Sequence, residues 1–295
     1  MWFSWRWRRP DRRRIPLFMT SPLISAEALA DRLGEPGLRI VDASWHLDGR
    51  DARADFAEAH IPGAVFLDLD AVSDADSPLP HTLPAPAAFA ASAGVLGLSD
   101  RDSIVVYDTS GLFSAARVWW MLTIMGARDV RVLDGGLPAW RAPGLPVESG
   151  VPARPGFAVF SHRFDADAVV AVDQVRDALT DGTQVVDARG AARFRGEAAE
   201  PRPGVRPGHM PGALNLPYGG LLNPDGTLKR GATLKAAFRD AGVDIDRPVI
   251  TTCGSGVTAA ILTLGLAELG RPSRLYDGSW SEWGAPEGGP VVTGP

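Results

Sequence analysis

Short apolar runs alternate along the chain with longer segments in which apolar residues recur at helical spacing. The runs "IVD", "SIVVYD", "VVD" and "PVITTC" are typical of strands. The helical pattern occurs at 25–33, 115–125, 168–179 and 258–269. Ser25 provides an N-cap side chain for the first of these helices. The alternation predicts an α/β fold with a mainly parallel sheet flanked by helices.

The pattern occurs twice in the chain. Residues 40–65 and 185–214 each contain an apolar run ending in Asp, then a polar stretch, and then His, a bulky apolar residue, Pro, Gly and Ala, as in "HIPGA" and "HMPGA". Later in each copy, "DGGLPAW" corresponds to "DGSWSEW", with Trp six residues after Asp in both. Self-similarity of this kind predicts a tandem duplication.

Only the second copy carries a cysteine. Asp108 lies 66 residues after Asp42, and Cys253 lies 66 residues after Asp187. Asp108 and Cys253 each follow a β-branched run and precede a helical segment, so the two positions correspond. The fold therefore does not require a thiol at this position.

The duplication sets the predicted domain organisation. A chain of 295 residues suits two domains of about 130 to 150 residues each. We expect the first domain, without a catalytic cysteine, at 19–145, a Pro- and Gly-rich linker at 146–166 and the catalytic domain at 167–295. Residues 1–18 contain six Arg and one Asp, and lack the apolar core of a secretory signal. We expect them to be a basic extension without fixed structure.

Composition excludes several classes of function. A hydrophobic content of 45% and a net charge of −5 describe an ordinary globular protein, so we expect no nucleic-acid partner. No apolar run reaches the roughly 20 residues that span a membrane. One cysteine cannot form an intramolecular disulfide, and we expect a cytoplasmic protein. One Cys and five scattered His do not form a metal site, and no cofactor is predicted.

Cys253 stands where a predicted strand gives way to a helix. The loop that follows consists of Gly254, Ser255, Gly256, Val257 and Thr258. Its backbone N–H groups can point at one spot beside the helix N-terminus, the two glycines supplying the unusual backbone angles and Thr258 capping the helix. Such a cradle favours the thiolate over the thiol. The position therefore predicts a nucleophile in place of a buried, inert cysteine.

The duplication, the Asp in place of Cys in the first copy, the "HIPGA" and "DGG" segments and above all "CGSGVTA" resemble the two-domain rhodanese-type sulfurtransferases over about residues 19–285. The pattern is closest to the members that use 3-mercaptopyruvate. The resemblance implies that each half is a rhodanese domain. It also implies that Cys253 takes a sulfane sulfur from a small-molecule donor and passes it, as a persulfide, to an external thiol such as thioredoxin or a small thiol.

The residues after the cysteine bear on the choice of donor. Thiosulfate-preferring relatives carry cationic residues there, whereas this chain has Gly254 and Ser255. Arg193 and Arg202 stand at positions that resemble the mercaptopyruvate-binding arginines of the family, and a guanidinium suits a carboxylate beside a keto group. We expect 3-mercaptopyruvate as donor, with release of pyruvate. Thiosulfate is the alternative.

The resemblance also pairs Ser255 with His81 and Asp70 of the first domain. Such a chain can move a proton between the donor thiol and the departing pyruvate enolate. The alternatives are that Ser255 caps the helix and that His81 is structural. Because these residues belong to both halves, we expect the active site to lie between the domains.

Two other functions are less consistent with the sequence. A cysteine phosphatase has the same strand, cradle and helix, but needs an Arg six residues after the Cys, where this chain has Ala259. A non-enzymatic rhodanese module that binds partners is the remaining alternative. The intact "CGSGVT" loop and the two arginines, Arg193 and Arg202, favour an enzyme.

Overall fold

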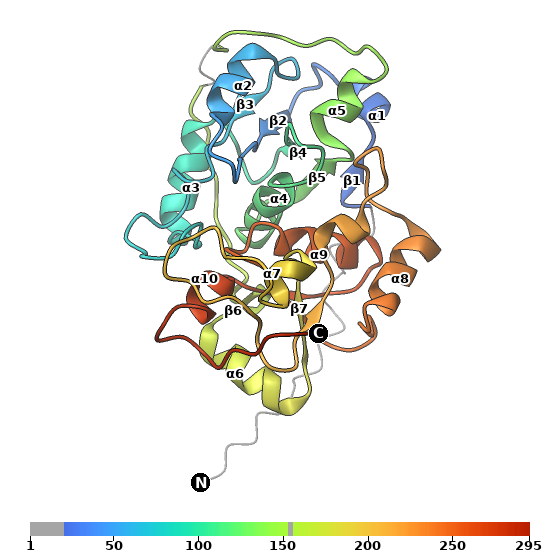
Figure 1. Ribbon diagram of the computed structural model, residues 1–295. Helices are drawn as coiled ribbons and strands as arrows, with labels where there is room; N and C mark the ends of the chain where they lie inside the picture. Colours follow the sequence, from blue (N-terminus) through green and yellow to red (C-terminus); the bar gives the residue numbers. More distant parts are fainter. Residues whose placement is uncertain (1–20, 153–155) are drawn as a thin grey trace.

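The computed structural model describes residues 21–152 and 156–295, so the predicted basic extension at 1–18 lies outside the described residues. The described chain forms two five-stranded sheets, one in each half, with helices around them (Figure 1). Every strand pair in these sheets is parallel. The predicted fold class, a duplicated α/β fold with parallel sheets, is confirmed.

The elements of the two halves follow the same order. The first half contains β1 (Leu23–Ile24), α1 (Ala26–Ala30), β2 (Leu38–Asp42), α2 (Ala52–Glu58), β3 (Val65–Phe66), α3 (Pro86–Val95), β4 (Ser103–Tyr107), α4 (Ala115–Ile124), β5 (Asp129–Leu133) and α5 (Gly136–Arg141). The second half contains η1 (Ala166–Ala168), β6 (Val169–Val170), α6 (Val172–Asp181), β7 (Gln184–Asp187), α7 (Ala191–Phe194), β8 (Leu214–Asn215), η2 (Tyr218–Leu221), α8 (Gly231–Asp240), β9 (Val249–Thr252), α9 (Ala259–Glu268), β10 (Arg274–Tyr276) and α10 (Ser279–Trp283).

The strand orders place the two key loops at equivalent sites. The orders are β1-β5-β4-β2-β3 and β6-β10-β9-β7-β8. The central strands β4 and β9 are almost entirely buried, which explains their continuous apolar and β-branched sequences. Asp108 and Cys253 directly follow β4 and β9, so each lies at the carboxyl edge of its sheet. This edge is where open parallel sheets bind ligands.

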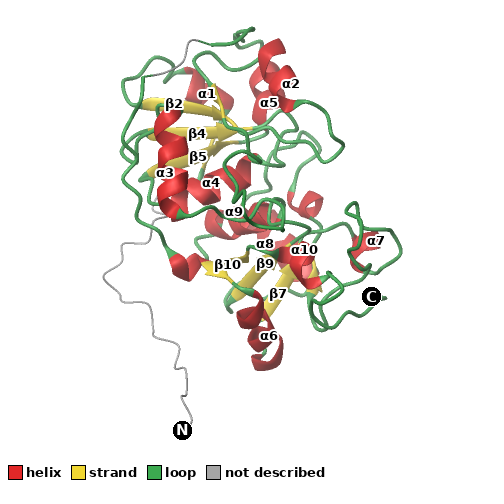
Figure 2. Cartoon of the chain, turned by 90° about the vertical axis from the view of Figure 1, so that its left-hand side faces the viewer, coloured by secondary structure: helices red, strands yellow, loops and turns green. Residues whose placement is uncertain are grey.

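Helices α4 and α9 join the two halves. They pack against each other, and Figure 2 shows them between the two sheets. Residues 259–267 of α9 are all buried. A helix that is apolar on every side must be covered on every side, and here α4, η2 and strands β9 and β10 of its own sheet do so. One hydrophobic core consequently extends from the first half into the second.

The first helix begins where the sequence predicts but ends at Ala30, three residues before the expected end at 33, and the third expected helix begins later than predicted. Ser25 accepts a hydrogen bond from the backbone N–H of Ala28 at 3.2 Å, so its predicted N-cap role is confirmed. The helix expected at 168–179 starts too early, because Val169–Val170 form β6 beside β10. Pairing with a neighbouring strand, which local periodicity does not contain, decides the state of these β-branched residues.

The segment between the halves lies along the first half. Its described residues between 142 and 165 form no helix or strand apart from a single bridge between Glu148 and His60. Arg163 donates its backbone N–H to the carbonyl of Met125 at 2.8 Å. These contacts tie the segment to the first half before it enters the second sheet.

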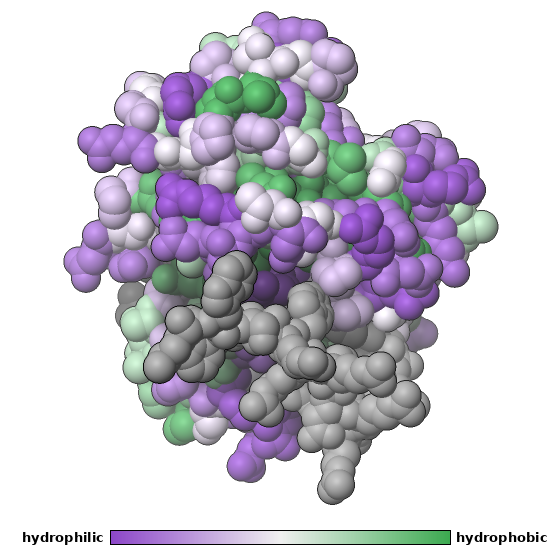
Figure 3. Space-filling view, turned by 90° about the horizontal axis from the view of Figure 1, so that it is seen from below, coloured by the Kyte–Doolittle hydropathy of each residue, from purple (hydrophilic) through white to green (hydrophobic). Residues whose placement is uncertain are grey.

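The outer surface is polar where it is seen from below. Figure 3 shows a predominantly hydrophilic face with apolar residues in small groups. Within 21–152 and 156–295, no helix is long and apolar enough to cross a membrane.

Candidate active site

The loop after Cys253 is fixed to the start of α10. Cys253 is 2% exposed. Its carbonyl accepts the backbone N–H of Trp280 at 2.9 Å, and the carbonyl of Gly254 accepts that of Ser281 at 2.8 Å. The backbone N–H of Cys253 donates to the hydroxyl of Ser279 at 3.3 Å. These bonds link Cys253 and Gly254 to the first residues of α10 and fix the backbone around the thiol.

The first half shows what such a loop binds. The Asp108 carboxylate, at the position of Cys253, accepts the backbone N–H groups of Phe113, Ser114 and Ala115 at 2.8, 3.0 and 2.9 Å. It also accepts that of Ser110 at 2.9 Å. The loop therefore gathers N–H donors around an anion at the start of α4.

The corresponding donors in the second half are not used by the protein. The backbone N–H groups of residues 255–259 donate no hydrogen bond to any group in the described part of the chain. Together with the helix N-terminus of α9, they form an arrangement that suits a thiolate or a persulfide anion on Cys253.

The two glycines of the loop have different roles. Gly256 has φ of +79°, a left-handed conformation that favours glycine. Gly254 does not have a positive φ, so the expectation that both glycines supply unusual angles is wrong for Gly254. A Cβ on Gly254 would lie 3.1 Å from Nη2 of Arg193 and 3.9 Å from Nη1 of Arg202. Gly254 leaves room for two guanidinium groups.

Arg193 and Arg202 thus converge on the residue next to Cys253. Arg193, on α7, is bound by Glu200, whose Oε1 accepts Nε at 3.2 Å. Arg202 lies in the following loop and places Nη2 3.4 Å from Oγ of Ser255. Burial and the nearby Arg193 lower the pKa of Arg202, which nevertheless remains protonated as arginines in proteins do. The pair can bind a small anion beside the thiol.

Glu200 is a site residue that the sequence did not reveal. Its side chain is only 4% exposed, and it accepts hydrogen bonds from Arg193 and, at 2.8 Å, from Nη1 of Arg189. Arg189 is buried, binds Asp187 with Nη2 at 2.6 Å and stacks over Trp280 at 4.2 Å. Arg189 therefore supports the site through its bonds to Glu200 and Asp187, and none of its hydrogen bonds goes to the loop after Cys253. No local pattern around Glu200 distinguishes it from other acidic residues in the sequence.

Ser255, His81 and Asp70 form a hydrogen-bonded chain across the domain interface. Oγ of Ser255 lies 2.8 Å from Nδ1 of His81, and Nε2 of His81 lies 3.0 Å from Oδ1 of Asp70. Trp45, another residue that the sequence did not reveal, donates Nε1 to Oδ2 of Asp70 at 3.2 Å. Its ring packs edge-on against His81, with centroids 4.6 Å apart. The structure thus brings together residues more than 170 positions apart in the chain.

The hydrogen bonds define the protonation pattern of His81. A carboxylate only accepts, so Nε2 carries the proton that is donated to Asp70. In the neutral ring Nδ1 then accepts the hydroxyl proton of Ser255. Burial lowers the pKa of His81 from its ordinary 6.5, against the opposing effect of Asp70, and the cations Arg202 and Arg117 lower it further. At neutral pH His81 is therefore uncharged and able to act as a base.

His81 also has an unusual backbone. Its φ is +59°, in the left-handed region that non-glycine residues seldom occupy. Such a conformation costs roughly 1 to 2 kcal/mol in an L-residue. The strain is maintained by the surrounding contacts, a common situation at functional sites.

The side chains of Val257 and Thr258, the last two residues of the loop, form neither a capping nor a ligand-binding group, in contrast to their backbone N–H groups. Val257 is buried in the core, 3% exposed. Thr258 occupies the N-cap position of α9, but its side chain makes no capping hydrogen bond, so the predicted cap is wrong. Thr258 has φ of −77° and ψ of −17°, whereas a capping side chain normally accompanies an extended backbone.

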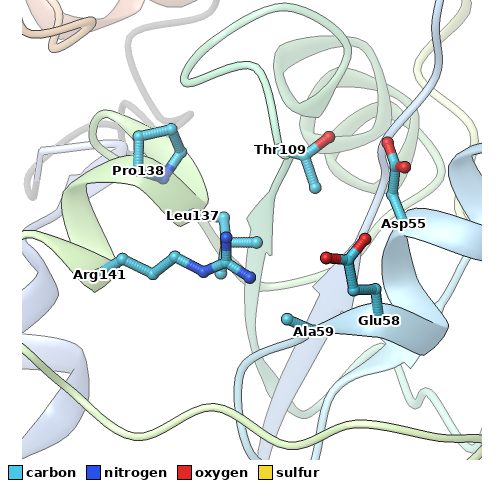
Figure 4. Close-up of a pocket in the computed structure, with 7 residues that line it drawn as sticks. All are labelled: Asp55, Glu58, Ala59, Thr109, Leu137, Pro138 and Arg141. Atoms are coloured by element: carbon cyan, nitrogen blue, oxygen red, sulfur yellow. The ribbon is translucent and has the colours of Figure 1, made fainter.

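The first half has its own cavity at the corresponding edge of the sheet. It measures about 330 Å³ and is lined by Asp55, Glu58, Ala59, Thr109, Leu137, Pro138 and Arg141. Figure 4 shows Arg141 and Glu58 reaching into it from α5 and α2. No thiol lies there, and the neighbouring loop is already filled by the Asp108 carboxylate. This cavity does not have the groups needed for sulfur transfer.

The described residues also contain no group of three or more His, Cys, Asp or Glu side chains that could hold a metal ion.

Comparisons with known proteins agree with this arrangement. The model of the rhodanese-like domain matches residues 25–143 and 171–286. The 3-mercaptopyruvate sulfurtransferase of Escherichia coli (strain K12) is 45% identical over 271 residues, covering 90% of this chain and 96% of the relative. The mitochondrial thiosulfate/3-mercaptopyruvate sulfurtransferase 1 of Arabidopsis thaliana is 42% identical over 291 residues, covering 90% and 76%. The crystal structure of SseA from Escherichia coli, at 42% identity, matches with a TM-score of 0.81 over 89% of this chain and 100% of SseA.

Proposed function

The chain belongs to the rhodanese family of two-domain sulfurtransferases, and we propose that it moves sulfur from 3-mercaptopyruvate, through a Cys253 persulfide, to an external thiol. The observation that carries the choice of donor is the convergence of Arg193 and Arg202 on Gly254. Two guanidinium groups beside the nucleophile suit a donor that has a carboxylate and a keto oxygen next to its thiol.

In the first half-reaction, the Cys253 thiolate attacks the sulfur of the donor. A new S–S bond forms while the C–S bond breaks, and its electron pair stays on carbon as the enolate of pyruvate. The proton of the donor sulfur passes through Ser255 and His81 to the enolate carbon, which gives pyruvate. The cradle at residues 255–259 then holds the persulfide anion on Cys253.

The neutral form of His81 supports this proton path. Its bare Nδ1 can take a proton through Ser255 and return it, while Asp70 stabilises the charged ring in between. Arg202, which contacts the same hydroxyl, favours a transient negative charge on Ser255. General acid–base assistance of this kind is worth about 10² to 10⁴ in rate.

In the second half-reaction, an external thiol removes the outer sulfur. The chain has a single cysteine, so no second thiol of its own can resolve the persulfide. Attack by the acceptor thiolate forms its persulfide and restores the Cys253 thiolate. Thioredoxin and small thiols are acceptors of the right chemistry, and since reducing compartments supply them, we propose a cytoplasmic location.

Thiosulfate is the second candidate donor. Two arginines beside a cysteine also suit a small dianion, and two relatives from Arabidopsis thaliana are named for both donors. The absence of a cationic side chain at Gly254 and Ser255 favours 3-mercaptopyruvate.

The test compares kcat/KM for the two donors in the parent enzyme, in Arg193→Ala and in Arg195→Ala. We expect a preference for 3-mercaptopyruvate, and a loss of roughly 10- to 100-fold for that donor in Arg193→Ala, because a charged hydrogen bond is worth about 1.5 to 3 kcal/mol. Arg195 pairs with Glu197 at the surface, so Arg195→Ala is the matched control and should behave like the parent. A preference for thiosulfate, or an unchanged value in Arg193→Ala, would overturn the assignment.

A further inference from the structure

The duplication has produced two reciprocal clamps across the domain interface. Asp134 follows β5 in the first half and accepts hydrogen bonds from two groups of the second half, the backbone N–H of Leu228 at 2.7 Å and Nη2 of Arg230 at 2.8 Å. Asp277, at the equivalent place after β10, accepts hydrogen bonds from two groups of the first half. These are the backbone N–H of Leu83 at 2.8 Å and Nη2 of Arg117 at 2.7 Å.

The two aspartates bind equivalent loops, but these loops differ in sequence. Two residues before Leu228 lies Gly226, with φ of +82°, and two residues before Leu83 lies His81, with φ of +59°. Gly226 lies against the loop of the other half at Gly111, and His81 lies against the other half at Ser255. The first copy thus carries a functional side chain at a left-handed position where the second copy has glycine.

Arg117 differs from Arg230 in its surroundings. The Arg117 side chain is fully buried, whereas that of Arg230 is 45% exposed. Besides Asp277, Nη2 of Arg117 donates to the carbonyl of His81 at 2.6 Å. Nη1 lies 3.0 Å from where a Cβ on Gly256 would stand. Arg117 therefore binds the backbone on the His81 side of the Ser255–His81 hydrogen bond, and its Nη1, which has no hydrogen-bond partner among the described residues, lies close to Gly256 on the other side.

We propose that Arg117 and Asp277 are positioning residues for the proton path, since they fix residues 81–83 at both ends and hold His81 in its strained conformation against Ser255. Arg117 fixes the carbonyl of His81, and Asp277 fixes the N–H of Leu83. The pair couples domain docking to assembly of the site, because each member belongs to a different half. This inference rests on the proposed sulfur transfer from 3-mercaptopyruvate.

The test compares two double variants, each of which removes the interdomain ion pair of one of the two corresponding aspartates, although the arginines come from different elements, α4 and the start of α8. Arg117→Met/Asp277→Asn removes the ion pair and the Arg117 bond to the His81 carbonyl without leaving either of the two charges unpaired, and Arg230→Met/Asp134→Asn removes the other ion pair. For each, kcat and KM with 3-mercaptopyruvate are measured across pH, and Tm is measured in parallel. The charged groups facing His81 are Asp70, Arg202 and Arg117, so a pH profile reports on this region.

We expect both variants to melt at lower temperature than the parent. Only Arg117→Met/Asp277→Asn should lower kcat, by roughly 10- to 100-fold with KM little changed, and lose the limb of the pH profile that depends on His81. Should that variant not fold, Arg117→Lys keeps the buried charge without the planar fork and should show the same pH change with a smaller loss of kcat.

The outcomes separate this proposal from the proposed function. If the parent uses 3-mercaptopyruvate and its pH limb disappears in His81→Ala, a folded Arg117 variant that keeps the parental kcat and limb overturns the positioning role alone. Equal losses in the two double variants also overturn it, since the effect would then be general to docking. A parent enzyme that does not use 3-mercaptopyruvate would contradict the proposed function itself.

Discussion

At the scale of single residues, the comparison of Asp108 with Cys253 explains how one loop can have two roles. In the first copy the side chain itself supplies the anion that the loop N–H groups bind. In the second copy the side chain is a thiol, and the same donors remain available for the charge that develops during sulfur transfer. The same loop position thus carries a bound carboxylate in one copy and a thiol in the other.

Local sequence features identified Cys253 and its loop as candidates, and the resemblance to the rhodanese-type sulfurtransferases added Arg193, Arg202, His81 and Asp70. Cys253, Ser255 and Arg202 belong to short patterns that are recognisable along the sequence, and the structure places them together with His81 and Asp70. Their roles in the reaction stay predictions.

The supporting residues could not be found in the same way. Trp45 and Arg117 contact residues distant in the sequence, and Glu200 contacts the buried Arg189. An isolated Trp, Glu or Arg has no spacing pattern that predicts such contacts.

The pH dependence of the reaction should reflect His81. Because burial lowers the pKa of His81 below 6.5, the ring stays neutral as pH falls to that value and becomes protonated only at lower pH. The kcat/KM for 3-mercaptopyruvate should therefore fall on acidification with a midpoint below 6.5, and this limb should be missing in His81→Ala. A His81-dependent limb with its midpoint above 6.5 would contradict the assigned protonation state.

Glu200 should affect substrate binding through Arg193. In Glu200→Gln the side chain keeps its shape but loses its charge, so Arg193 and Arg189 lose a buried ionic partner. We expect KM for 3-mercaptopyruvate to rise by roughly tenfold, corresponding to about 1.4 kcal/mol, with a smaller change in kcat. Glu197→Gln, which alters an exposed pair with Arg195, is the control. Equal KM values in the two variants would show that Glu200 does not position the arginine.

At the scale of elements, the turn from β9 into α9 depends on Gly256. Gly256→Ala introduces a Cβ at φ of +79° and 3.0 Å from Nη1 of Arg117. We expect a loss of unfolding free energy of about 1 to 2 kcal/mol from the backbone alone, and a further loss from the contact. Urea denaturation measures the first quantity, and kcat reports the displacement of the loop.

A matched control exists at the other end of the same helix. Gly270 has φ of +68°, and a Cβ there would meet nothing within 4 Å. Gly270→Ala should therefore lose only the backbone contribution and keep the parental kcat. A kcat for Gly256→Ala equal to that of Gly270→Ala would contradict the importance of the loop shape.

The sequence predicted elements best where periodicity and burial agree. Helices α4 and α9 appear in the expected places because a long apolar segment between two sheets has only one stable state. The sequence did not reveal strand β6 at Val169–Val170. A two-residue edge strand forms through pairing with its neighbour, here β10, and no local pattern predicts that pairing.

At the scale of the whole molecule, duplication explains why the two halves have the same architecture, although only the second carries a cysteine. The two halves share strand order and an Asp after the last strand that accepts a backbone N–H of the other half, so this symmetry of the interface follows from the repeat. Two departures from that symmetry lie at the candidate site: Cys253 stands at the position of Asp108, and His81 stands where the second copy has Gly226. The repeat itself was evident in the sequence, whereas the face on which the halves meet required the structure.

The central claim is that Cys253 carries the sulfur between donor and acceptor. The most direct measurement is the intact mass of the protein after addition of 3-mercaptopyruvate without an acceptor thiol, followed by localisation of the added mass by peptide mapping. We predict the gain of one sulfur atom on Cys253, its loss on addition of a thiol, and no gain in Cys253→Ser. A protein that releases pyruvate without gaining sulfur, or that gains it in Cys253→Ser, would contradict the account.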